Sequence, residues 1–81
     1  MEDAKKTGRS LQDIGCEIIR VWKKPYFGAV PYMRAMTGLQ DIDDYYGMDS
    51  AREIVLRFLT NASRWRGEDA KRIKAELRAM L

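Results

Sequence analysis

The chain has 81 residues, of which 46% are hydrophobic and 33% are charged, a balance typical of one small domain with a single core. No apolar run approaches the ~20 residues that cross a bilayer, and the start MEDAKKTGRS has no apolar signal core, so we expect a cytoplasmic protein. The formal net charge of +3 permits an anionic partner without requiring one. With no histidine and one cysteine, we expect no metal site, no cofactor and no internal disulfide.

The first nine residues are polar, so we expect a flexible segment over 1–9 ahead of a single helical domain over 10–81. Ser10 is suited to cap the first helix, whose apolar residues recur at helical spacing. These residues are Leu11, Ile14, Ile18, Val21 and Trp22. Pro25 then ends this helix, because the residue before a proline avoids the helical region.

The stretch KPYFGAVPY, residues 24–32, is interpreted as the turn between the first two helices. Gly28 permits backbone conformations closed to other residues, and Pro31 suits the first turn of a new helix. We expect the rings of Tyr26 and Phe27 to point inward and close one end of the bundle. Exposed rings that bind a ligand or partner are the alternative.

Apolar residues at helical spacing continue from Tyr32 to Tyr46, past Gly38. A glycine inside a helix costs about 1 kcal/mol relative to alanine. We expect one helix over 31–46, with two short helices meeting at Gly38 as the alternative. Three acids would form its solvated face, and their spacing fails the EF-hand pattern, so we expect no calcium site. These acids are Asp41, Asp43 and Asp44.

Gly47 is expected in a left-handed conformation that ends the second helix. The motif SARE at 50–53 predicts a capping box, in which Ser50 and Glu53 exchange side-chain bonds to each other's amides. The strongest amphipathic pattern of the chain follows it and predicts a third helix packed in the core. Its apolar residues are Ala51, Ile54, Val55, Phe58, Leu59 and Ala62.

Gly67 separates the third helix from a fourth, whose first turn carries Glu68 and Asp69 at the positive end of the helix dipole. The fourth helix continues to the C-terminus with an apolar stripe of Ala70, Ile73, Leu77 and Met80. No strand-like alternation competes with this pattern. The predicted fold class is therefore all-α, a compact small bundle of about four helices.

Catalytic signatures are missing from the sequence. It offers no histidine base, no Gly-rich phosphate loop and no nucleophile elbow. We therefore expect no enzymatic activity, no catalytic residue and no small-molecule substrate. Cys16, on the first helix near Ile19, is expected to be a partly buried, inert thiol.

Two sets of residues indicate binding. Five methionines and eight aromatic residues exceed what the helical stripes need, which favours a surface for a protein partner or a homo-oligomer. The candidates for this surface are Tyr26, Phe27, Met33, Tyr45 and Met48. The second set is basic: its cations would hold phosphates while Trp65 stacks on a base. Its members are Arg64, Trp65, Arg66, Lys71, Lys74 and Arg78.

The balance of these features favours a non-enzymatic interaction module that acts through protein contacts or self-association. Binding to DNA or RNA through the basic C-terminal helix is the runner-up. The two predictions differ in what they require of Lys71 and Lys74, because only nucleic-acid binding depends on those charges.

Two stretches, YFGAVPYMRAM and YGMDSAREIVLRFLTNASRWRGEDAKRIKAEL, resemble a group of small uncharacterised helical proteins of bacteriophages and mobile elements in Gram-positive bacteria. The similarity covers residues 14–81. It is carried by Tyr26, Phe27, Gly28, Pro31, Tyr32, Gly47, Ser50 and WRGE at 65–68. The resemblance implies a small cytoplasmic accessory protein in a mobile-element setting, where nucleic-acid binders and inhibitors of host proteins are both common. It implies no particular activity.

Overall fold

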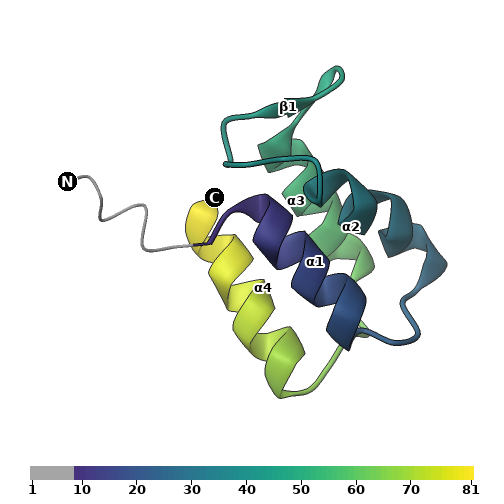
Figure 1. The fold of residues 1–81 in the computed structure, drawn as a ribbon. Coiled ribbons are helices and arrows are strands. Elements are labelled where there is room, and N and C mark those ends of the chain that lie inside the picture. The colour runs from purple at the N-terminus through teal and green to yellow at the C-terminus, as the bar shows by residue number, and fades with distance from the viewer. Residues whose placement is uncertain (1–8) are drawn as a thin grey trace.

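The computed structural model describes residues 9–81 and shows four α-helices with a small hairpin between the second and third (Figure 1). The elements are α1 (Leu11–Val21), the 3-10 turn η2 (Phe27–Ala29), α2 (Val30–Met36), β1 (Tyr45–Tyr46), β2 (Asp49–Ser50), α3 (Ala51–Asn61) and α4 (Glu68–Met80). The compact helical fold is confirmed, but the two-stranded sheet makes "all-α" only approximately right. The segment predicted to be flexible lies, except for Arg9, outside the described residues.

The starts of α1 and α3 agree with the predicted caps. The Ser10 hydroxyl accepts a hydrogen bond from the amide of Asp13 at 3.1 Å, and the Ser50 hydroxyl accepts one from the amide of Glu53 at 3.2 Å. The Glu53 carboxylate lies 3.6 Å from the guanidinium of Arg57. Half of the predicted capping box therefore forms, and Glu53 uses its carboxylate along the helix instead.

The second helix is much shorter than predicted, because α2 ends at Met36. The next three amides donate to carbonyls three residues back, which is the tighter 3-10 pattern. The Asp44 carboxylate then accepts hydrogen bonds from the amides of Gln40 at 2.9 Å and Asp41 at 3.1 Å. Aspartates favour such local bonds, which compete with a helix. The prediction of one helix over 31–46 was wrong because these bonds turn the chain into a loop.

The hairpin that follows has two residues in each strand. Tyr45 pairs with Ser50 and Tyr46 pairs with Asp49, in antiparallel register. Gly47 has a φ of +65°, so its left-handed conformation is as predicted, but it forms a hairpin turn rather than a helix end. A glycine with positive φ at the first position of a two-residue loop is typical of a type II′ turn. This turn sets the backbone register of the two strands.

One hydrophobic core joins the four helices. The predicted apolar stripes of α1, α3 and α4 all face it, and its largest fully buried side chains are Phe58, Leu11, Ile14, Ile18, Met36, Leu39, Ile73, Leu77 and Val55. Gly15 lets α1 approach α2 closely. A Cβ there would lie 3.0 Å from Cβ of Met36 and 3.1 Å from the backbone nitrogen of Thr37.

Ion pairs hold α4 against α1 along one side. The Arg72 guanidinium bonds the Glu17 carboxylate at 2.7 Å and the Asp69 carboxylate at 3.0 Å. Arg9 pairs with Glu17 and with Glu76, the latter at 2.7 Å. Hydrogen bonds from Arg72 and then Arg9 lower the pKa of Glu17 to about 2. Glu17 is thus the shared acceptor that joins the two helices.

The helices separate two loops in space. The hairpin directly precedes α3, and the loop over 62–67 directly follows it; with 11 residues, α3 is about 16 Å long. The helix α1 runs in the same direction as α3. At its start, the amide of Leu11 donates to the carbonyl of Gln40, in the loop before the hairpin, at 2.8 Å. At its other end, Trp22 stacks on Trp65 of the α3–α4 loop. The hairpin and the α3–α4 loop therefore lie at opposite ends of the molecule (Figure 1).

Candidate functional site

Three large side chains stand out from the hairpin, and we call them the hairpin surface: Tyr45, Tyr46 and Met48. Met48 is 95% exposed and Tyr45 is 69% exposed. Both side chains are therefore accessible to a binding partner. Tyr46 is half-exposed and packs over Gly38, where a Cβ would lie 3.4 Å from its ring. The hairpin surface is thus apolar, outward-facing and anchored on one side.

Aspartates surround the hairpin surface. Residues 39–50 contain four aspartates and no lysine or arginine. The Asp44 carboxylate is occupied by the backbone of the loop, but Asp43 and Asp49 are exposed to solvent. The nearest cation to Asp43 is Arg52, at 3.9 Å. The hairpin therefore presents apolar side chains within a negatively charged loop.

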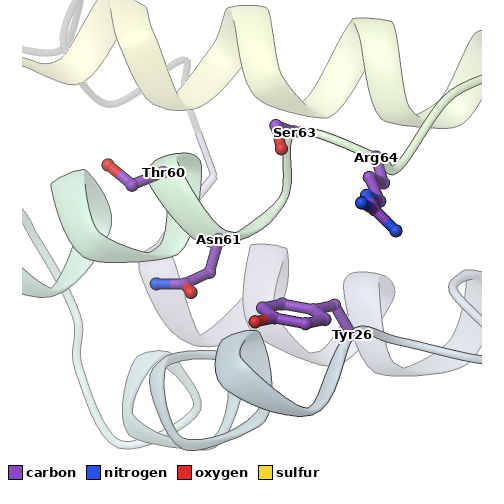
Figure 2. A pocket seen from close by; sticks show the side chains of 5 residues that line it. All are labelled: Tyr26, Thr60, Asn61, Ser63 and Arg64. Carbon is purple, nitrogen blue, oxygen red and sulfur yellow. The ribbon is translucent and has the colours of Figure 1, made fainter.

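A pocket of about 290 Å³ lies at the other end of α3, lined by Tyr26, Thr60, Asn61, Ser63 and Arg64. In Figure 2 the Tyr26 ring lies across from Ser63 and Arg64, with Asn61 beside it. Sequence reasoning missed Thr60, Asn61 and Ser63, for which the polar run at the end of α3 is the one available signal. The pocket is polar, with one aromatic face and one cation.

Gly28 makes room for the wall of this pocket. A Cβ at Gly28 would lie 2.6 Å from the Tyr26 ring and 2.8 Å from the side-chain oxygen of Asn61. The Asn61 side-chain nitrogen donates to the carbonyl of Arg57 at 2.8 Å, which fixes the amide. The glycine is therefore required for the close approach of Tyr26 to the end of α3.

Tyr26 and Phe27 do not close the bundle, so the prediction that their rings point inward was wrong. Phe27 is 78% exposed and Tyr26 is 47% exposed, with their ring centroids 5.0 Å apart. The reason is that Trp22 and Trp65 already fill this end of the core. The alternative, exposed rings available to a partner, agrees with the structure.

Trp65 and Met33 lie in the core and not at a surface. Trp65 is 6% exposed and Met33 is 3% exposed, so Trp65 has no free face for a base and Met33 offers no contact surface. Both predicted roles were wrong. The sequence did contain a signal for the burial of Trp65. Trp65 follows Phe58 by seven residues, so it continues the apolar spacing of α3 beyond the end of that helix.

The basic residues of the C-terminal region divide by role. Arg64, Arg66, Lys71 and Arg78 are exposed, whereas the ammonium of Lys74 donates to the carbonyl of Trp65 at 2.6 Å. Burial lowers the pKa of Lys74, and the charges of Arg78 and Arg66 lower it further. Lys74 is thus partly structural, and it sits in a cluster of like charges on the side of α4 away from Glu17.

Three further observations concern the thiol, the possible metal ligands and the lengths of the helices. Cys16 is exposed on α1, which corrects the prediction of a partly buried thiol. Within residues 9–81, no three carboxylate or thiol side chains gather as metal ligands would. None of the helices in that range has the length and apolar character to cross a membrane.

No protein-family model matches this chain, and no curated protein or solved structure is significantly similar to it. The resemblance to small phage and mobile-element proteins therefore stays a prediction.

Proposed function

We propose that this protein is a non-enzymatic helical interaction module that acts through protein contacts, with the hairpin surface as its contact site. The observation that supports this most directly is the exposure of Met48 and Tyr45 at a fixed hairpin turn. Single exposed apolar residues are normal in small proteins, but here three large ones gather on one short hairpin. A phage or mobile-element setting is part of this proposal.

The composition of the hairpin surface also suits protein recognition. Tyrosine and methionine are enriched at the cores of protein interfaces, and a methionine side chain adapts to irregular surfaces. The tight turn around Gly47 fixes the backbone at Tyr45 and Met48 before binding, which reduces the backbone entropy lost on association.

The test is the size of the tagged protein in extracts of cells that express it, measured by gel filtration. We expect the wild-type chain to elute in a complex and the variant Tyr45→Ser with Met48→Ser to elute as the free tagged chain. The control is Ile19→Ser, which removes a half-exposed apolar side chain from α1 and should elute as the wild type does. Elution of the wild type as the free chain would contradict the proposal.

A second candidate function, binding of DNA or RNA, is favoured by one observation. The charges of Arg66 and Arg78 both lower the pKa of Lys74, and the exposed Lys71 lies on the same side of α4 as Arg78, seven residues later. A cluster of cations attracts phosphates and releases their counterions. Because Trp65 is buried, it cannot stack on a base. The nucleic-acid hypothesis therefore depends on the basic side chains alone.

Fluorescence anisotropy with labelled DNA and RNA, at low and near-physiological salt, tests this candidate. Lys71→Glu with Arg78→Glu should weaken binding at least ~10-fold and flatten its salt dependence. Lys74 is left unchanged because it bonds the Trp65 carbonyl. The matched control, Arg20→Glu with Arg34→Glu, makes the same charge change elsewhere on the surface. An equal loss in both variants, or no binding at low salt, would reject the candidate.

A further inference from the structure

We infer that the hairpin surface docks on the pocket-bearing end of a second copy of this chain, so that the protein self-associates head to tail. This inference rests on the proposed function and names the partner. We call the receiving surface the basic end; it comprises Lys23, Lys24, Tyr26, Phe27, Arg64 and Arg66, all exposed and all in the pocket or within three residues of it in sequence.

The two surfaces carry opposite charge. The hairpin segment, residues 39–50, has four aspartates and no cation of its own, although Arg52 of α3 lies 3.9 Å from Asp43, whereas the basic end has four cations. Glu68 is the exposed carboxylate near the basic end, since Asp69 is paired with Arg72 at 3.0 Å. Opposite potentials on two surfaces steer their encounter and fix their relative orientation.

The two surfaces also match in their apolar side chains. Met48 and Tyr45 extend from the hairpin, and Phe27 and Tyr26 extend from the basic end. Methionine sulfur and aromatic rings attract one another, as do pairs of rings. The polar pocket of about 290 Å³ beside Tyr26 also contains Arg64, whose guanidinium can pair with an aspartate of the hairpin.

The two surfaces lie too far apart to meet within one chain. They are separated by the length of α3, about 16 Å, so the hairpin cannot reach the basic end of its own chain. A contact between two different surfaces of identical chains is heterologous, and it produces rings or open chains rather than closed two-fold dimers. This property distinguishes the inference from ordinary dimerisation.

The experiment is sedimentation velocity on two purified variants, alone and mixed. The hairpin variant, Tyr45→Ser with Met48→Ser, keeps an intact basic end; the end variant, Tyr26→Ser with Phe27→Ser, keeps an intact hairpin. All four side chains are exposed, so both variants should fold, which circular dichroism checks. We expect wild-type protein to form species larger than a dimer, and each variant alone to stay monomeric.

The equimolar mixture is the decisive sample. Each chain in it has one intact surface, and the two are complementary, so we expect dimers and nothing larger. Raising the salt to ~0.5 M should weaken wild-type assembly several-fold, because exposed charges are screened.

Three outcomes would overturn the inference. A wild-type chain that stays monomeric up to ~1 mM would exclude self-association, while a complex in cell extracts would still support the proposed function with a different protein partner. A variant that forms dimers on its own would show that like surfaces meet. A mixture that stays monomeric although the wild type assembles would show that the hairpin and the basic end do not bind each other, and hence that the head-to-tail contact is wrong. Loss of both the cell-extract complex and the assembly would reject the proposed function itself.

Discussion

The indole rings of Trp22 and Trp65 stack with centroids 5.0 Å apart and planes 11° from parallel. Trp22 follows the last turn of α1, and Trp65 lies in the loop between α3 and α4. Phe58 meets both rings edge-on, at 6.2 Å and 6.3 Å. These three rings join three segments of the chain at the end of the core nearest the basic end.

Replacing Trp65 should therefore destabilise the fold and not merely alter a surface. We expect Trp65→Ala to lower the free energy of unfolding by about 3–5 kcal/mol, through lost burial and a cavity, and Trp65→Phe to cost less. Urea denaturation followed by circular dichroism measures both. An unchanged midpoint for Trp65→Ala would mean that the indole is not in the core.

Gly15→Ala tests the close approach of α1 and α2. Alanine favours a helix by about 1 kcal/mol over glycine, but here its Cβ would meet the Thr37 backbone nitrogen at 3.1 Å, which cannot move freely. We expect a net loss of about 1–2 kcal/mol, because overpacking outweighs propensity.

The matched control for Gly15 is Gly38→Ala. The nearest atom to a Cβ at Gly38 is in the Tyr46 ring, at 3.4 Å, an ordinary contact. We expect Gly38→Ala to change the free energy of unfolding by less than ~0.5 kcal/mol. A stabilised Gly15→Ala variant would show that α1 can move away from α2 at little cost.

Acid should loosen the contact between α1 and α4. The pKa of Glu17 falls from 4.5 to about 2 on folding, because Arg72 and Arg9 bond its charged form. A lowered folded-state pKa stabilises the fold fully above the unfolded value, and this contribution is lost as the pH falls from about 5 to 2. Urea midpoints across this range should therefore decrease.

Glu17→Gln isolates this effect from the other carboxylates. The variant should be less stable than the wild type at pH 7, and the difference between the two should shrink as the pH approaches 2. A difference that stays constant with pH would show that the Glu17 charge does not hold α4 in place.

Asp44→Ala tests why the second helix ends early. Its carboxylate accepts two amide hydrogen bonds in the loop after α2, so we expect a loss of about 1–2 kcal/mol. The control, Asp43→Ala, removes an exposed carboxylate whose nearest cation lies 3.9 Å away, and should cost less than ~0.5 kcal/mol. Equal effects would contradict the role of Asp44 in the loop.

The sequence predicted the helices well where apolar spacing and caps agreed. Ser10 and Ser50 mark the starts of α1 and α3, and Gly67 marks the boundary before α4. The second helix was overextended because Leu39 and Ile42 still pack against the core from a loop, so their spacing imitates a helix. Competition from the Asp44 carboxylate is not visible in apolar spacing.

The candidate site was predicted only in part. Exposure of Tyr26, Phe27, Tyr45 and Met48 agrees with a contact role, whereas the burial of Trp65 and Met33 contradicts it. Aromatic and methionine residues serve cores and interfaces equally, so composition alone does not assign them. The pocket joins residue 26 to residues 60–64, and such a meeting depends on the tertiary fold.

The most direct test of the central claim is site-specific photo-crosslinking in cells, with a photoreactive amino acid in place of Met48. A second position, Ala75 on the outer face of α4, serves as the control. We predict a protein adduct from position 48 that maps to the peptide around Tyr26 of another copy, and little or none from position 75. Equal adducts from both positions, or adducts to nucleic acid alone, would contradict the account of the hairpin as a protein-contact surface.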